Sequence, residues 1–199
     1  METVLYTKEG DVGIIKLNRP EAYNAINPLL VQELGVLFDE IEKDQTVKVV
    51  IIASASDKAF CSGADLKSAS SMSMEDTEKH IMAGQALYRK IDNFPKPVVA
   101  AINALALGGG LEMSLACDDR VIVDGAKVGN PEAKLGLLPA WGGTQRLTKI
   151  VGRGIAAEMI LTGGQINAKK ALEFGLVSKM VSSVAELIPT AIEMAKALL

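Results

Sequence analysis

The chain has 199 residues, 49% of them hydrophobic, which suits one globular domain with a sizeable core, or such a domain with an appendage. Its 21 Lys and Arg and 24 Asp and Glu leave a formal net charge of -3 without a long basic run, which argues against a nucleic-acid partner. The N-terminus lacks a signal-type apolar segment and the most apolar run (98–110) is too short to cross a bilayer, so we expect a soluble, cytoplasmic protein with no membrane partner.

Strand and helix patterns alternate through the first two thirds of the chain. Alternating β-branched residues predict a hairpin, and apolar residues at helical spacing predict helices separated by wholly apolar strands. The predicted elements are a hairpin (4–17), a helix (29–41), a strand (47–53), a helix (73–91), a strand (97–102), a helix that ends at Ala116 and a strand (120–123). Strands that are apolar on both faces and alternate with helices predict an α/β fold, with a largely parallel sheet and helical layers.

Helical patterns dominate the last third of the chain. The predicted elements there are helices over 143–151, 155–161 and 168–174, a short strand over 177–181 and a final helix that starts at Ala185. That helix is still apolar at Leu199, without a capping glycine or asparagine. We therefore expect a core domain over 1–184, with 185–199 as the start of an incomplete helical segment that exposes apolar side chains, namely Leu187, Ile188, Ile192 and Leu198.

Three consecutive glycines, Gly108–Gly110, stand between a predicted strand and a helix that contains Glu112. Glycine loses more backbone freedom on folding than any other residue, so the triplet needs a structural or functional reason. One reason is a tight crossing between strand and helix. The other is a ligand, because the first N–H groups of a helix lack partners within it and would stabilise a carbonyl oxygen that becomes an enolate.

Three further segments add candidate residues, and the first of them points to the same edge of the sheet. FCSGADL (60–66) follows a buried strand after a short turn, so its backbone donors could converge with those of the triplet. NPE (130–132) and LLPAWGGTQRL (137–147) follow the strand at 120–123, and the second places another glycine pair at a helix start.

Cys61 and Cys117 lack metal-ligand or CxxC spacing, and His80 lies among charged residues, so we expect packed thiols, a solvated histidine and no metal.

Taken together, FCSGADL, ALGGGLEMSLACD (106–118), GNPEAKLGLLP (129–139), GGTQRL (142–147) and the opening LNRPEAYNA (17–25) resemble the enoyl-CoA hydratase/isomerase, or crotonase, family, and its hydratases most closely. The resemblance runs from about Val4 to Leu199 and implies a spiral of ββα units, a coenzyme A thioester substrate and an oxyanion hole of two backbone N–H groups. In this sequence those donors fall on Ala64 and Gly109. The two carboxylates of the family's hydratases fall on Glu112 and Glu132.

The resemblance implies a lyase that adds water reversibly to a 2-enoyl-CoA, in fatty acid metabolism, without a metal or redox cofactor. Glu112 would activate the water and Glu132 would protonate the α-carbon, whereas an isolated glutamate is ordinarily a solvated surface charge. Coenzyme A would bind at a set of residues in the first loop and the GAD segment, namely Ala22, Ser62, Ala64, Leu66 and Lys67.

The sequence departs from the family pattern at three places. Ala140 stands where relatives have a glycine whose N–H helps to hold the water, and an alanine would be strained at a positive φ. Trp141 stands at a position that faces the acyl pocket in relatives, which implies a restricted acyl group. Relatives also continue beyond this chain with helices that support a homotrimer or a dimer of trimers. The alternatives are a double-bond isomerase, another acyl-CoA enzyme of the family, and a non-catalytic acyl-CoA-binding protein.

Overall fold

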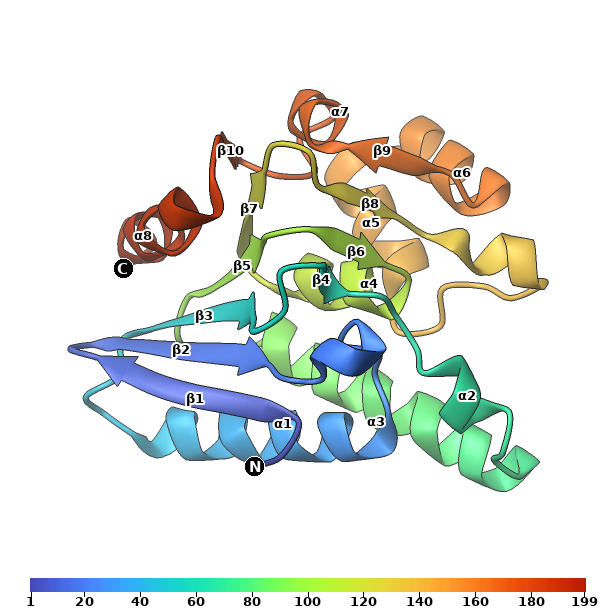
Figure 1. The fold of residues 1–199 in the computed structure, drawn as a ribbon, viewed down its shortest axis with the longest axis horizontal. Helices are drawn as coiled ribbons and strands as arrows, with labels where there is room; N and C mark the ends of the chain where they lie inside the picture. The colour runs from blue at the N-terminus through green and yellow to red at the C-terminus, as the bar shows by residue number, and fades with distance from the viewer.

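The structure is a computed structural model that describes residues 1–199, and it contains two sheets wrapped by helices (Figure 1). The strands are β1 (Val4–Glu9), β2 (Val12–Leu17), β3 (Val49–Ser54), β4 (Ala59–Cys61), β5 (Val98–Ile102), β6 (Leu105–Leu107), β7 (Asp119–Val123), β8 (Lys127–Gly129), β9 (Gln165–Asn167) and β10 (Lys179–Val181). The α-helices are α1 (Pro28–Lys43), α2 (Leu66–Ala69), α3 (Met74–Asp92), α4 (Gly109–Ala116), α5 (Gly143–Val151), α6 (Arg153–Thr162), α7 (Ala168–Glu173) and α8 (Val184–Lys196), and the 3-10 helices are η1 (Pro20–Ala22) and η2 (Pro131–Leu135). No helix is both long and apolar enough to cross a membrane.

The larger sheet has six strands in the order β1-β2-β3-β5-β7-β10. Only the predicted hairpin, β1 with β2, is antiparallel, and every other pair is parallel. The apolar residues of β3 explain why both faces of the sheet are covered, because alternate residues are buried on opposite faces. Val50 and Ile52 belong to a core of 40 buried residues shared with α1, whereas Val49 and Ile51 belong to a second core of 14 residues. This α/β architecture confirms the predicted fold class.

The smaller sheet, β4-β6-β8-β9, was not predicted. Each of its strands has three residues, which is too short for the alternation of apolar and polar residues to be recognised. β4, β6 and β8 pair in parallel, and β9 is antiparallel to β8. The sheet matters for the site because β4 leads into the GAD segment and β6 leads into the glycine triplet.

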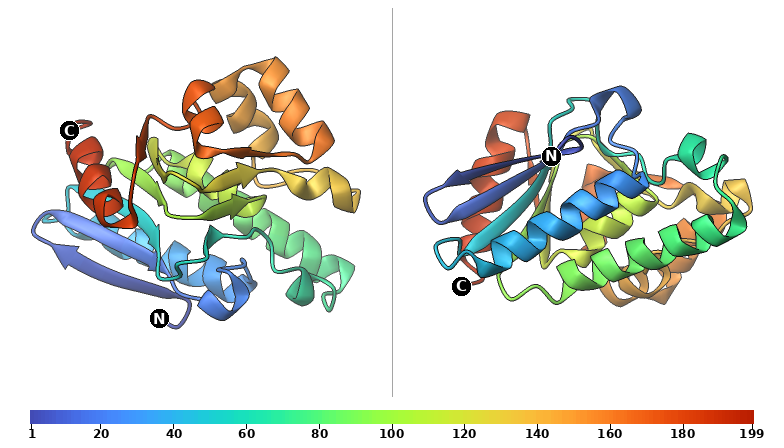
Figure 2. Two further views of the ribbon diagram at one scale, coloured as in Figure 1. Left: turned by 45° about the horizontal axis from the view of Figure 1, so that its top comes forward. Right: turned by 90° about the horizontal axis from the view of Figure 1, so that it is seen from below.

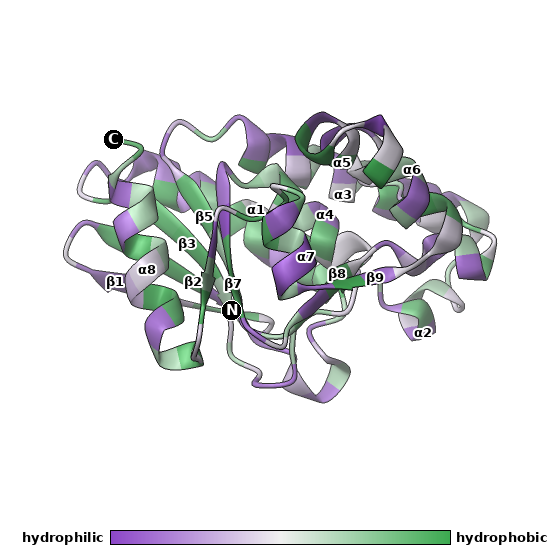
Figure 3. Cartoon of the chain, turned by 90° about the horizontal axis from the view of Figure 1, so that it is seen from above, coloured by the Kyte–Doolittle hydropathy of each residue, from purple (hydrophilic) through white to green (hydrophobic).

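The last helix, α8, covers the face of the large sheet that bears the second core (Figures 2 and 3). Leu187 is 2% exposed there, and Ile188 and Ile192 are partly buried against the same cluster. The expectation that these side chains are exposed is therefore wrong for Leu187 and overstated for the two isoleucines, because the sheet itself provides an apolar surface for the helix. Of the four, Leu198 is exposed, at 49%.

Helix α4 lies between the two sheets and contacts α3, α5, β4, β6 and β7 (Figure 1). All eight of its residues are buried, Glu112 included. A helix that is buried all round has no polar face, so a carboxylate within it must find its partners in the protein.

Candidate active site

The glycine triplet caps α4 and is closely packed. Gly108, at φ 49° and ψ -123°, is the N-cap, in a conformation that side chains disfavour, and its N–H donates to the Gly129 carbonyl of β8 at 2.9 Å. A β-carbon on Gly109 would lie 2.3 Å from Cζ3 of Trp141, so an indole ring occupies the space that a side chain would need. The tight crossing that the sequence left open is therefore real at both positions.

The GAD segment lies directly beside this cap. Ile26 donates its N–H to the Gly63 carbonyl at 2.8 Å and accepts from the Asp65 N–H at 3.0 Å, which fixes the backbone on both sides of Ala64. Ala64 is exposed and its own N–H donates to no atom of the chain. A β-carbon on Gly63 would lie only 3.4 Å from the Gly109 nitrogen. The predicted pair of donors, Ala64 and Gly109, is thus brought to adjacent loops.

Glu112 is held by the beginning of α5. Its Oε1 accepts the N–H groups of Trp141 at 2.8 Å and Gly143 at 2.7 Å, and the side chain is 2% exposed. Gly143 is the first residue of α5, so its N–H is an unpaired donor of a helix N-terminus, where the dipole favours a negative charge, and Trp141 lies just before it. Of the glycine pair at 142–143, Gly143 therefore donates a hydrogen bond to Glu112, a contact that the local sequence does not indicate.

Burial outweighs this stabilisation. Removal from water, with a smaller contribution from the Glu132 charge, raises the pKa of Glu112 to about 7, against the lowering effect of the two backbone hydrogen bonds and of the Arg146 charge. A carboxyl with this pKa exchanges its proton near neutral pH, which is the property expected of an acid or base in catalysis.

Glu132, on η2, lies on the other side of the triplet. A β-carbon on Gly108 would be 3.1 Å from its Oε1, while the Gly108 carbonyl accepts the N–H of Glu112 at 2.9 Å. The Oε2 atom of Glu132 is buried without a partner, and the amide of the fully buried Asn130 reaches Oε1 only at 3.4 Å. Burial accordingly raises the pKa of Glu132. The sequence did not indicate a role for Asn130.

Trp141 is buried inside the protein, at 5% exposure, next to Gly109 and α3. Its ring meets those of His80 and Tyr88 edge to face, with centroids 5.5 and 5.6 Å apart. The expected solvated His80 is therefore incorrect: the ring is half-buried, its Nδ1 has no partner, and desolvation lowers its pKa. Tyr88 was not predicted, and its hydroxyl donates to the Gly109 carbonyl at 2.7 Å.

Ala140 does not carry the strain that its departure from the family pattern suggested. Tyr23 and Asn24 are the non-glycine residues with positive φ, so Ala140 adopts an ordinary backbone conformation. Its carbonyl accepts a hydrogen bond from the Gln85 side chain at 2.8 Å. The backbone around the Trp141 and Gly143 donors is thus anchored to α3.

The residues predicted to bind coenzyme A lie on two loops joined by a hydrogen bond and on the start of α2, and this set is called the predicted coenzyme A ledge. The Ser62 N–H donates to the Tyr23 carbonyl at 3.0 Å, which aligns the loop of Ala22 with the GAD segment, and Leu66 and Lys67 follow on α2 as exposed side chains. Two unpredicted residues support the ledge. Arg19 pairs with Asp65 at 2.9 Å, and the buried Asn24 donates to the Phe60 carbonyl at 2.9 Å.

Neither cysteine resembles a nucleophile. Cys61 and Cys117 are buried, and desolvation raises the pKa of each thiol to about 12, so both remain protonated and act as packing residues, as predicted. The candidate reactive groups are therefore the two carboxyls and the backbone donors around the start of α4.

The chain is similar to known proteins in both sequence and fold. A family model described as enoyl-CoA hydratase/isomerase matches residues 7–199. A short-chain-enoyl-CoA hydratase of Clostridium acetobutylicum is 40% identical over 195 residues, which are 98% of this chain and 74% of the relative. A crotonyl-CoA hydratase of Syntrophomonas wolfei is 38% identical over 188 residues, 94% of this chain and 72% of the relative. The crystal structure of an enoyl-CoA hydratase from Bacillus anthracis superposes with a TM-score of 0.94 at 39% identity, covering 98% of this chain and 76% of that one.

Proposed function

The chain belongs to the enoyl-CoA hydratase/isomerase family, and we propose that its two carboxyls, Glu112 and Glu132, and two backbone donors add water reversibly to a 2-enoyl-CoA, giving a 3-hydroxyacyl-CoA. The relatives named as short-chain and crotonyl-CoA hydratases support a hydro-lyase, and a short 2-enoyl group is the proposed substrate. No metal or redox cofactor takes part in the proposed reaction.

The backbone N–H groups of Ala64 and Gly109 hold the thioester oxygen. Addition of water to the β-carbon moves an electron pair onto that oxygen, so the reaction depends on stabilising an enolate. Two fixed donors stabilise it without solvent reorganisation, each by roughly 2.7 to 4 kcal/mol. The support for this role is that the Ala64 N–H has no acceptor in the chain and that the Gly109 N–H is the first of α4.

The two carboxyls divide the proton transfers. Glu112 has backbone donors for its charged form and takes a proton from water as the water oxygen bonds to the β-carbon. Glu132 has only the Asn130 amide, at 3.4 Å from Oε1, and an unpartnered Oε2, so it carries the proton that goes to the α-carbon. The pair titrates as a coupled unit, and each hydration leaves a proton on Glu112 and none on Glu132, so a proton must pass back to Glu132, directly or by exchange with solvent, before the next turnover.

One observation supports the proposal most strongly: Glu112 and Glu132, far apart in sequence, flank the same glycine cap with raised pKa values. The test is loss of the conjugated thioester absorbance of crotonyl-CoA. Glu112→Gln should lower kcat by a factor of about 10² to 10⁴, whereas Glu158→Gln on the exposed face of α6 should not change it. Equal turnover by the Glu112→Gln variant and the unmodified chain would exclude the role of Glu112.

We also propose that the protein assembles, as a homotrimer or a dimer of trimers. The support is an exposed apolar segment after Glu132, in which Leu135, Leu137 and Leu138 are 56%, 54% and 68% exposed. Sedimentation velocity over a range of concentrations tests this, and replacement of the three leucines by serine should shift the distribution to monomers. A monomer at all concentrations would contradict it.

A further inference from the structure

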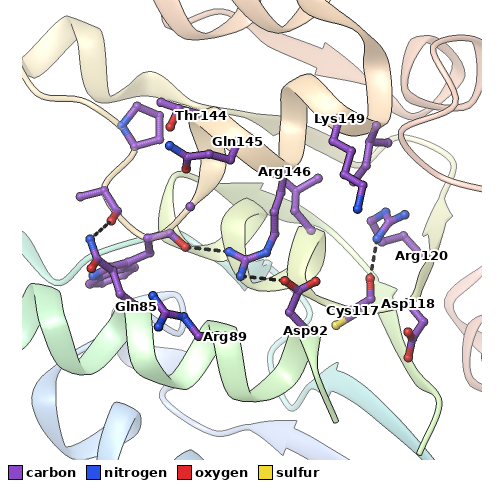
Figure 4. Close-up of a pocket in the computed structure, with 16 residues that line it drawn as sticks. Gln85, Arg89, Asp92, Cys117, Asp118, Arg120, Thr144, Gln145, Arg146 and Lys149 are labelled. Carbon is purple, nitrogen blue, oxygen red and sulfur yellow. Dashed lines mark hydrogen bonds and ion pairs between the residues drawn. The ribbon is translucent and has the colours of Figure 1, made fainter. Parts of the chain in front are cut away.

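A cavity lies beside the candidate active site, between α3, the end of α4 and α5 (Figure 4). It has a volume of about 790 Å³ and shares Ala140 and Trp141 with the back of the site. Glu112, Glu132, Ala64 and Lys67 do not line it, so it is separate from the predicted reaction centre and from the predicted coenzyme A ledge.

The cavity has an excess of positive charge although the chain as a whole is acidic. Its charged lining residues are Arg89, Arg120, Arg146, Lys149, Asp92 and Asp118. Asp118 uses one carboxylate oxygen to accept the Val98 N–H at 2.7 Å, and Asp92 pairs only with Arg146, at 3.2 Å. Two acids therefore face four cations.

Several of these cations retain unused hydrogen-bonding groups. The side chains of Arg89 and Lys149 form no ion pair or hydrogen bond within the chain. The Nε of Arg146 is buried without an acceptor, while its other nitrogens bond to the carbonyls of Trp141 and Tyr88 and to Asp92. Arg120 is 6% exposed and donates to the Leu176 and Cys117 carbonyls, neither of which neutralises its charge. Clustered, partly desolvated cations of this kind favour an anion.

We propose that this cavity binds a multiply charged organic anion that carries phosphate groups. Arginine forks and a lysine match the geometry and charge of phosphate oxygens, and Gln85 and Gln145 add neutral donors at the rim. The volume is within the range of small-molecule sites and exceeds that of a single phosphate, so the ligand has an organic part. Free phosphoesters and a second coenzyme A molecule both have this chemistry.

An anion in the cavity acts close to the reaction centre. Arg146 Nη1 donates to the carbonyl of Trp141 at 3.0 Å. The backbone N–H of Trp141 in turn donates to Glu112 Oε1 at 2.8 Å. A ligand that engages Arg146 therefore contacts the segment that positions Glu112, whichever reaction that carboxyl serves.

Calorimetric titration of the full chain with inorganic pyrophosphate at low ionic strength tests the proposal. We expect one saturable site, weakened about tenfold or more in the double variant Arg89→Gln/Lys149→Gln and unchanged in Lys67→Gln on the coenzyme A ledge. Both altered side chains of the double variant are exposed and unbonded, so the fold should persist, and its melting curve checks this. The absence of saturable binding, or weakening only in Lys67→Gln, would overturn the proposal.

Two additional measurements identify the source of the ligand. The first is titration with coenzyme A. If the cavity binds a second coenzyme A molecule, the unmodified chain has two coenzyme A sites and the double variant has one. If the cavity binds a free phosphoester, both proteins have one coenzyme A site. Sedimentation of the same samples must show an unchanged association state. If the double variant loses both pyrophosphate binding and self-association, the cavity is an interface between copies and the proposal fails.

Discussion

The Oε1 atom of Glu112 lies 2.7 Å from the backbone nitrogen of Gly143, so a carboxyl from one buried helix caps the N-terminus of the next. The α5 terminus and the Trp141 N–H favour the carboxylate, whereas burial in α4 and the nearby Glu132 favour the protonated form. The balance, a pKa of about 7, links the chemistry of the site to the stability of the fold.

The first prediction concerns the pH dependence of hydration. If Glu112 is the base, only its deprotonated form accepts the proton from water, so kcat/KM for crotonyl-CoA should fall about tenfold per pH unit below about pH 7. Initial rates from about pH 5 to about pH 9 measure this limb. A limb near the ordinary glutamate pKa in the unmodified chain would contradict the assignment.

The second prediction is that the site lowers stability at neutral and higher pH. The pKa of Glu112 rises from 4.5 to about 7 on folding, so the folded state binds the proton more tightly and stability falls as the pH rises between these values. Glu112→Gln keeps an oxygen for both backbone donors and removes the buried charge. Above pH 7 it should stabilise the fold by on the order of 3 kcal/mol, and below the ordinary pKa it should have little effect.

Thermal melts at the two pH extremes test this difference, with Glu158→Gln as a matched exposed control. The size of the gain in unfolding free energy measures how much the buried charge of Glu112 destabilises the folded state. A variant that is less stable than the unmodified chain above pH 7 would show that the hydrogen bonds outweigh desolvation.

Long elements could be predicted from the sequence because each buries a continuous apolar pattern. The helix at 143–151 was predicted with the bounds that the structure shows, and the strands at 47–53 and 97–102 were correct within two residues. The three-residue strands of the small sheet were missed, since their pairing depends on the tertiary position of β6 between β4 and β8 rather than on local pattern.

The predicted site residues did come together, but the family resemblance rather than periodicity identified them. The supporting residues could not be found in this way, because their roles depend on long-range contacts. Tyr88 reaches Gly109, Asn24 reaches Phe60, and Gln85 reaches Ala140, which is 55 positions away. His80 was misplaced for the same reason, since nothing in its charged local sequence indicates the indole beside it.

A third prediction concerns Lys67 on the predicted coenzyme A ledge. Its side chain is exposed and free of ion pairs, so a contact with a substrate phosphate would be partly screened by solvent. Lys67→Ala should raise KM by a factor of about 2 to 5 with kcat unchanged, and Lys127→Ala, another exposed lysine, should change neither. An unaltered KM in Lys67→Ala at low ionic strength would remove this residue from the site.

The fourth prediction is a coupling between Gly84 of α3 and Trp141. A β-carbon at Gly84 would lie 2.4 Å from the indole nitrogen, so Gly84→Ala should cost about 1 to 3 kcal/mol of stability. With Trp141→Ala the whole indole is absent, and the cost should shrink or reverse, because alanine is about 1 kcal/mol better than glycine in a helix. Denaturant unfolding of the four proteins in this double-mutant cycle measures the coupling. Additive effects would show that the two positions do not contact each other.

The last prediction is that Trp141 limits the length of the acyl group. The indole fills the space between Gly109 and α3, next to the proposed position of the thioester, so an acyl chain directed toward α3 meets the ring after few carbons. Trp141→Ala should increase kcat/KM for six- and eight-carbon enoyl-CoA substrates relative to crotonyl-CoA, which a series of initial rates measures. The truncation costs about 3 to 5 kcal/mol, so the milder Trp141→Phe provides a folded variant with a smaller shift in the same direction. Ile41→Ala, a buried truncation in α1, controls for destabilisation alone and should leave the ratio unchanged. If both Trp141 variants retain the chain-length profile of the unmodified protein, the ring is a packing residue and the acyl group follows another path.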